Sequence, residues 1–179
     1  MKKILAVLMI VVACFVGCAA AGPKPPIELP FAVHKAGATV STELRIPEKG
    51  PFVYQFALKF MHNDGDRADR MRDRERVRKL LGSGGKNKWT GKLVDPGIPI
   101  SIKITLSEID SLGEHIFLEK EFSTAGIDAN GSNYFKREIG LRELKRSPGL
   151  YRVTVKNLKG VPELEGTRVL FIIDYPRQG

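Results

Sequence analysis

Residues 98–107 read IPISIKITLS, and apolar and polar positions alternate through the stretch. The apolar side chains are Ile98, Ile100, Ile102, Ile104 and Leu106. A strand that buries one face and exposes the other has this period of two. Asp95, Pro96 and Gly97 form a turn signal directly before it. The stretch therefore predicts a half-buried strand that follows a turn.

The same period recurs on both sides of this stretch. It predicts strands at residues 40–46, 52–60, 116–122, 134–144, 151–155 and 168–175. The last of these is apolar on both faces, which is typical of a strand in the centre of a sheet or under a loop. Helical spacing occurs once, near residues 66–82. We therefore expect a mainly β fold, an antiparallel immunoglobulin-like β-sandwich of about eight strands with one inserted, charged α-helix.

The N-terminus reads MKKILAVLMIVVACFVGC over residues 1–18. Its apolar run at 4–16 is too short to span a bilayer as a permanent helix, so it indicates a secretory signal. Both cysteines of the chain, Cys14 and Cys18, lie in this segment. The rest of the chain has no thiol, so it cannot form a disulfide and must be stabilised by burial of apolar surface.

The end of the apolar run resembles the lipobox of bacterial lipoproteins, because small residues flank Cys18 on both sides. Phe15 departs from that motif, in which Leu, Val or Ile is usual, and Cys14 is the alternative site. The resemblance implies cleavage before Cys18 and its acylation, including with palmitate. Ala19 after the cysteine is similar to lipoproteins of the outer membrane. The plain alternative is a signal peptide whose cysteines are only apolar filler.

The expected organisation follows from these segments. Residues 1–17 form the signal peptide, and residues 18–26, rich in alanine and proline, form a tether. Residues 27–179 form a single β-sandwich domain with a helical insertion at 66–88. The formal charge is +9, and loss of the signal lowers it to +7. A basic tethered domain favours contact with an anionic membrane, lipopolysaccharide or wall polymer. Export excludes nucleic acid as a partner.

The inserted helix is the most charged part of the chain. Residues 66–81 read DRADRMRDRERVRKLL, in which acids lead and bases end, as the helix dipole prefers. Acid–base pairs at helical spacing are Asp66 with Arg70, Asp69 with Arg72, Asp73 with Arg76 and Glu75 with Lys79. Val77, Leu80 and Leu81 share one face, so the last two turns should dock on the domain.

Two interpretations of this helix stay open. Its cations are candidates for binding an anionic group, namely Arg70, Arg72, Arg74, Arg76, Arg78 and Lys79. The alternative is an ion-paired helix that only keeps one face solvated, as charge runs usually do. A phosphate loop needs its glycines before a helix, whereas Gly82, Gly84 and Gly85 follow this one. A nucleotide site is therefore excluded, and Gly82 is expected to end the helix.

Catalytic and metal motifs are missing from the sequence. His34, His62 and His115 have no metal-ligand spacing, and no serine stands in a nucleophile motif. We expect no catalytic residue, metal or cofactor. A hydrolase with its site on the loops at 62–66 or 124–133 is the alternative. Trp89, beside two lysines, is either an exposed contact for sugar or lipid or a cover for the edge of the core.

Four stretches resemble a family of uncharacterised proteobacterial lipoproteins that carry a β-sandwich domain of unknown function. They are LPF at 29–31, DRERVRKL at 73–80, DPGIPI at 95–100 and PGLYRV at 148–153. The last also resembles the penultimate strand of immunoglobulin-like domains. The family implies tethering in the periplasm and supplies no catalytic residues. We expect a non-enzymatic module that binds an envelope component or a protein partner.

Overall fold

The computed structural model describes residues 23–48, 54–62, 65–141 and 148–175. The expected signal peptide at 1–17, the expected lipidation site Cys18 and part of the expected tether lie outside these ranges. So do residues 52–53 and 142–144, at the ends of two expected strands. None of the helices within the described ranges combines the length and apolar character needed to cross a bilayer.

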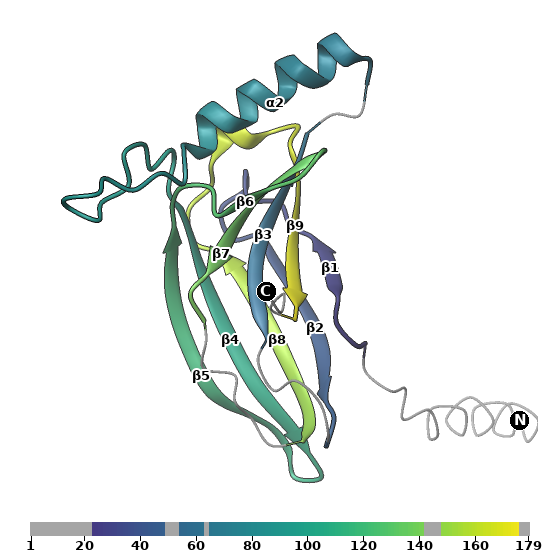
Figure 1. Ribbon diagram of the computed structural model, residues 1–179. Helices are drawn as coiled ribbons and strands as arrows, with labels where there is room; N and C mark the ends of the chain where they lie inside the picture. The colour runs from purple at the N-terminus through teal and green to yellow at the C-terminus, as the bar shows by residue number, and fades with distance from the viewer. Residues whose placement is uncertain (1–22, 49–53, 63–64, 142–147, 176–179) are drawn as a thin grey trace, which may run out of the picture.

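Nine strands in the described ranges form two antiparallel sheets, and a helix lies across one end of them (Figure 1). The strands are β1 (Ile27–Pro30), β2 (Thr39–Ile46), β3 (Gln55–Met61), β4 (Ile100–Asp110), β5 (Gly113–Thr124), β6 (Ala129–Asn130), β7 (Tyr134–Ile139), β8 (Gly149–Asn157) and β9 (Arg168–Asp174). The helices are α2 (Arg67–Leu81) and the 3-10 turn η1 (Pro162–Leu164). The mainly β sandwich with one inserted helix is confirmed, with nine strands rather than about eight.

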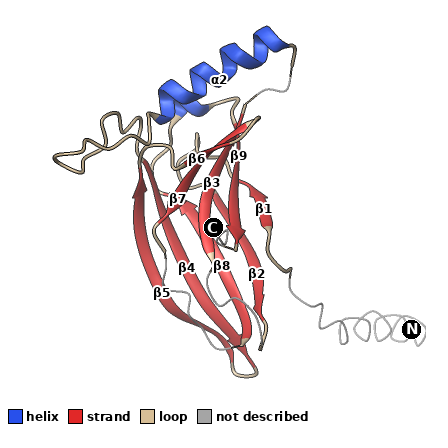
Figure 2. Cartoon of the chain, viewed as in Figure 1, coloured by secondary structure: helices blue, strands red, loops and turns tan. Residues whose placement is uncertain are grey.

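The sheet order places sequence-distant strands side by side. One sheet has the order β1-β9-β3-β7-β6 and the other the order β2-β8-β4-β5 (Figure 2). β8, the penultimate strand, lies between β2 and β4, and its Tyr151 is buried. β9 lies between β1 and β3 and is buried on both faces, since both Phe171 and Ile172 are inaccessible to solvent or nearly so. The expected central position of the last strand is confirmed.

The core lies between the two sheets and is filled by every second side chain of the facing strands. From β4 these are Ile100, Ile102, Ile104 and Leu106, and from β3 Phe56, Leu58 and Phe60. The alternating apolar residues between 100 and 106 therefore form the inward face of β4. Ile98 lies just before the strand, and its N–H donates to the carbonyl of Leu80 in α2 (2.8 Å).

Candidate functional site

The helix α2 starts with a side-chain cap and is docked by its second half. Asp66 is the N-cap, and its Oδ1 accepts the N–H of Asp69 (2.9 Å). The expected ion pair from Asp66 to Arg70 is wrong, because the carboxylate is used as the cap. Val77 and Leu81 are the buried side chains of the helix. The apolar face is short, because the first turns carry no buried apolar residue. The helix therefore packs on the sandwich through its last turns.

The C-terminal carbonyls of α2, which have no partner within a helix, are bonded from outside. Gly82 ends the helix with φ 75°, and its N–H is bonded to the carbonyl of Arg78 (2.9 Å). The last two carbonyls of the helix belong to Leu80, which accepts the N–H of Ile98, and to Leu81, which accepts a bond from Nη2 of Arg137. The sheets therefore complete the end of the helix.

Arg137 of β7 is fully buried and joins three elements. Besides the Leu81 carbonyl at the end of α2, its guanidinium donates to the carbonyls of Ile98 (2.7 Å) and Thr124 (3.3 Å). Its Cζ lies 5.8 Å from the centre of the Phe60 ring. Burial lowers the pKa of Arg137 to about 10, opposed in part by the Asp128 carboxylate, so the side chain stays charged at neutral pH.

The exposed arginines of α2 are mostly paired with acids on the helix itself. Arg72 is paired with Asp69, as expected from the sequence, and Arg78 donates to both oxygens of Glu75 (2.9 Å each). This bidentate bond lowers the pKa of Glu75 and raises that of Arg78. Lys79 lies at 4.0 Å from the same carboxylate, so the expected pair with Glu75 is formed but is the longer of the two.

Two further arginines of α2 reach back to the sandwich. Arg74 Nη1 donates to the carbonyl of Gly131 (2.9 Å) and to Nε2 of His62 (3.2 Å), and its Cζ lies 5.0 Å from the Phe135 ring centre. Arg76 Nη2 donates to Oγ1 of Thr167 (2.9 Å) while it is also paired with the expected partner, Asp73. These contacts hold the helix in place, and 43% of the Arg76 side chain stays exposed beside its ion pair.

Of the six candidate anion-binding residues, Arg70 is the one whose side chain has no hydrogen bond or ion pair within the described residues. It lies on the exposed first half of α2, one residue before Met71, which is 62% exposed. The sequence placed all six cations on one helix, and the structure gives five of them intramolecular partners. The paired helix is the pattern that the solvated interpretation predicts.

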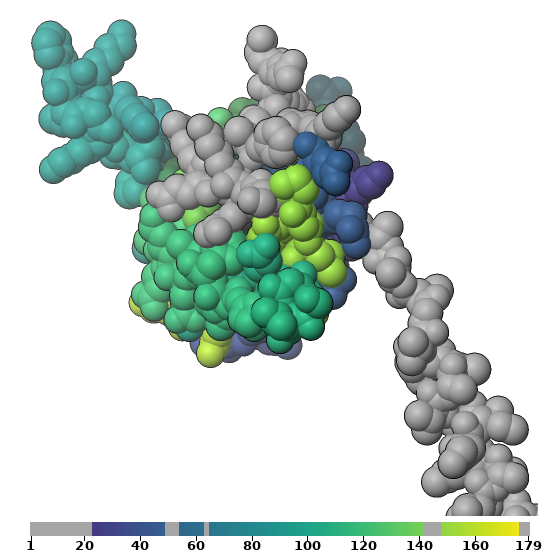
Figure 3. Space-filling view, turned by 90° about the horizontal axis from the view of Figure 1, so that it is seen from below, coloured from purple at the N-terminus to yellow at the C-terminus, as the bar shows by residue number. Residues whose placement is uncertain are grey.

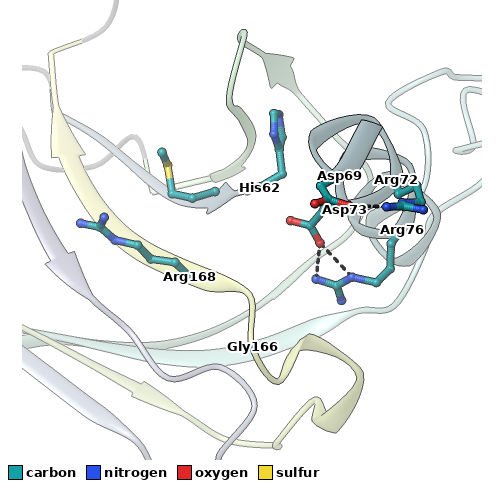
Figure 4. A pocket seen from close by; sticks show the side chains of 8 residues that line it. His62, Asp69, Arg72, Asp73, Arg76, Gly166 and Arg168 are labelled. Atoms are coloured by element: carbon teal, nitrogen blue, oxygen red, sulfur yellow. Dashed lines mark hydrogen bonds and ion pairs between the residues drawn. The ribbon is translucent and has the colours of Figure 1, made fainter. Parts of the chain in front are cut away.

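A cleft of about 660 Å³ lies between α2 and the ends of β3 and β9 (Figure 4). Its helix wall consists of the two ion pairs Asp69–Arg72 and Asp73–Arg76. Arg168 lies on the opposite side, and its guanidinium points away from the helix (Figure 4). Charges of both signs therefore line the cleft, and the described residues that line it include no cluster of unpaired cations.

The two loops expected to carry a hydrolase site, at 62–66 and 124–133, meet at the helix. His62 is buried, and its N–H is bonded to the carbonyl of Asn133 (3.2 Å). Because a guanidinium can only donate, the bond from Arg74 makes Nε2 of His62 an acceptor. This nitrogen is used to dock α2. Among the described residues no group of three or more His, Cys, Asp or Glu side chains is placed to hold a metal ion.

Sequence reasoning missed the role of Arg137 and left that of Trp89 open. The sequence did carry a signal for Arg137, because it alternates with Phe135 and Ile139 and so shares the inward face of their strand. Trp89 is 95% exposed, so it does not cover the edge of the core. Cys18, the expected lipidation site, lies outside the described residues.

The architecture is that of a two-sheet β-sandwich with a helix docked across one end. A model of the family described as a domain of unknown function, DUF5625, matches residues 28–175. The chain therefore belongs to the DUF5625 family. It is also similar to the crystal structure of GEBA250068378 from Sulfurospirillum deleyianum, with a TM-score of 0.68, 25% identity, and coverage of 86% of this chain and 98% of that chain. None of the curated proteins compared with the sequence matches it.

Proposed function

We propose that the protein is an exported module, acylated at Cys18 and tethered to the outer membrane, that binds an envelope component without catalysing a reaction. The tether is supported by the signal segment and by the small residues around Cys18. β1 starts at Ile27. At about 3.5 Å per residue, the intervening chain keeps the domain within roughly 30 Å of the anchor.

The observation that carries the non-enzymatic part of the proposal is the use of His62. His62 begins one loop of the hydrolase alternative, and its N–H is bonded to Asn133 at the end of the other. Its Nε2 accepts a bond from Arg74, which also donates to the carbonyl of Gly131. A general base needs its free nitrogen directed at a substrate proton. Here that nitrogen is directed at a guanidinium which anchors the helix, so His62 supports the docking of α2.

Labelling with radioactive palmitate tests the anchor. The wild-type chain and Cys14→Ser should incorporate label and fractionate with the outer membrane, whereas Cys18→Ser should not. Equal labelling of wild type and Cys18→Ser contradicts the proposal, and loss of label in Cys14→Ser alone moves the site. Turnover of a hydrolytic substrate panel, lost in His62→Ala while its circular dichroism is unchanged, contradicts the non-enzymatic assignment.

A second candidate is binding of an anionic envelope component by the outer face of α2. The observation in its favour is Arg70, which has no partner among the described residues, next to Arg72, whose side chain is 78% exposed despite its ion pair. The variant that tests it is Arg70→Ser with Arg72→Ser. Arg74 and Arg76 are unsuitable for this purpose, because their loss would release the helix from the sandwich.

A further inference from the structure

The segment between α2 and β4 forms what we call the projecting hairpin (residues 83–95). Its arms are joined by backbone bonds from Ser83 N–H to the Asp95 carbonyl and from Asn87 N–H to the Lys92 carbonyl (2.9 and 2.8 Å). It extends sideways beyond the sandwich at the helical end of the molecule (Figure 1). Viewed along the sandwich, it stands clear of the body (Figure 3). The hairpin is thus an ordered projection that encloses no core of its own.

The base of the projecting hairpin is held tightly. A Cβ on Gly97 would lie 2.2 Å from the carbonyl carbon of Leu81, and a Cβ on Gly82 would lie 2.4 Å from the backbone nitrogen of Gly97. The two backbone segments therefore cross at these glycines. Leu93 packs beside Gly126, where a Cβ would lie 3.1 Å from its side chain. Because the two glycines allow the backbones to cross, the hairpin leaves the sandwich in a defined direction.

The tip of the hairpin is also defined. Oδ1 of Asn87 accepts the N–H groups of Trp89 (2.9 Å) and Thr90 (3.0 Å), and the N–H of Gly91 is bonded to the Asn87 carbonyl (2.9 Å). This turn presents Trp89, which is 95% exposed, at the end of the projection. A side chain presented by an ordered turn loses little backbone entropy when it binds.

The charges of the hairpin differ from those of α2. The hairpin contains three lysines, Lys86, Lys88 and Lys92, and a single acid, Asp95, at its base. None of the three has an ion pair or a side-chain hydrogen bond within the described residues, whereas the exposed arginines of α2 are mostly neutralised by acids on the same helix. Three unpaired lysines therefore surround Trp89, while Arg67, Arg70 and Arg168 at the same end of the molecule also lack a partner within the described residues.

From this arrangement we infer that the projecting hairpin is a contact site for an anionic phospholipid bilayer. Tryptophan prefers the headgroup level of a membrane, where its ring is buried and its N–H stays hydrated. Lysines beside it are attracted to anionic headgroups. Val94, 70% exposed, adds apolar surface on the same hairpin. The three lysines therefore attract the hairpin to the anionic bilayer, and Trp89 inserts into its headgroup region.

The shape of the site favours a bilayer over a sugar or a protein groove. A sugar site is usually concave and places polar groups around an aromatic ring, whereas Trp89 is nearly fully exposed at a convex tip. A planar surface accepts a convex tip without any complementary cavity. The opposite end of the sandwich offers a comparison, since Leu112 in the β4–β5 turn is 85% exposed but stands between Asp110 and Glu114. An anionic membrane would repel that turn.

The test uses Trp89 as its own reporter, because it is the single tryptophan of the chain. The chain from Ala19 onward contains every strand and helix described here and can be used without the acyl group. The inference does not depend on acylation, so failure of the anchor and failure of the contact are seen separately. Vesicles of phosphatidylglycerol should move the Trp89 emission to shorter wavelength, and brominated lipids should quench it. Phosphatidylcholine vesicles should do neither.

Variants separate the hairpin from the rest of the surface. Each Lys→Gln change at 86, 88 or 92 should weaken binding about fivefold, and the triple variant about a hundredfold, since each lysine near an anionic surface contributes a similar amount. Trp89→Ala should lower co-sedimentation with the same vesicles. Leu112→Ala, a matched change at an exposed apolar tip, should leave binding and emission unchanged.

Three results would overturn the inference. One is an emission spectrum that stays unchanged while the protein sediments with anionic vesicles, which would place the contact on another face. Another is a shift of the Trp89 emission with a soluble polyanion such as dextran sulfate that is as large as the shift with vesicles, which would show that the hairpin binds a polymer. The third is a triple lysine variant that binds as tightly as wild type.

Discussion

Arg137 should contribute several kcal/mol to the stability of the fold, and Arg137→Met removes that contribution. Methionine is similarly long and unbranched but has no donor, so the carbonyls of Leu81, Ile98 and Thr124 lose their shared partner. Each hydrogen bond from a charged group is worth about 1.5–3 kcal/mol. The lowered pKa of Arg137, about 10, corresponds to a desolvation penalty of about 3 kcal/mol that the variant no longer has. The three bonds outweigh this penalty, and we expect a net loss of about 3 kcal/mol.

Urea unfolding followed by far-ultraviolet circular dichroism measures the loss. The fluorescence of Trp89 is unsuitable because that side chain is exposed in the folded state. For a chain of this size, about 3 kcal/mol also lowers the melting temperature by roughly 6–12 °C. The matched control is Arg168→Met, the same substitution at an exposed side chain of β9 that has no hydrogen bond or ion pair within the described residues. This control should cost less than about 1 kcal/mol.

An Arg137→Met variant that is as stable as wild type, or more stable, would refute the reasoning. It would mean that burying the charge costs more than its three bonds return, as happens for some buried ion pairs. Hydrogen exchange adds a local test, because the Leu81 carbonyl loses its donor at the end of α2. Amides in the last turn of α2 should exchange faster in the variant, relative to those of β4.

Two further predictions concern the base of the projecting hairpin and the buried tyrosine of the core. Gly97→Ala should lower the melting temperature, because its Cβ would lie 2.2 Å from the carbonyl carbon of Leu81 and φ is 60°, whereas Gly140→Ala, with open space around it, should be nearly neutral. Burial, and to a lesser degree the charge of Tyr175, raises the pKa of Tyr54, so stability should fall as the pH rises past about 10. Tyr54→Phe should weaken that fall without loss at neutral pH, since its hydroxyl has no partner among the described residues; urea midpoints at both pH values check this.

The sign of the tyrosine effect follows from linkage. A folded-state pKa above the unfolded value means that the folded protein keeps the proton while the unfolded chain releases it. Stability is therefore complete below the unfolded pKa and is lost as the pH rises towards the folded pKa. If wild type and Tyr54→Phe lose stability equally at high pH, the phenol of Tyr54 is not the group responsible.

The strands could be predicted because burial of one face leaves a period of two in the sequence. β4, β8 and β9 were all found in this way, and the helix was found from its acids, bases and the terminal Gly82. β6, with two residues, was too short to leave a pattern, and β7 ends at Ile139 rather than extending towards 144. Short strands are defined by their neighbours in the sheet, which a local pattern does not contain.

The candidate site could be predicted less well, because its meaning depends on partners from distant segments. The sequence showed that acids precede the bases of α2, but the bonds from Arg74 to His62 and Gly131 require β3 and the loop before β7 to meet at the helix. The exposure of Trp89 likewise depends on whether the hairpin folds back onto the sandwich. The lysines and glycines of the hairpin are compatible with either arrangement. The backbone crossing at Gly97 directs the hairpin outward, and that crossing is a contact with the end of α2.

Co-sedimentation of the chain from Ala19 onward with anionic and neutral vesicles, with and without lipopolysaccharide, across a salt series is the first experiment to make on the projecting hairpin. The protein should bind anionic vesicles and be released as salt rises and screens the lysines. The triple lysine variant should lose this binding, and Arg70→Ser with Arg72→Ser should retain it. Absence of binding to every vesicle, or loss in the arginine variant alone, would contradict the assignment of the projecting hairpin as the membrane contact.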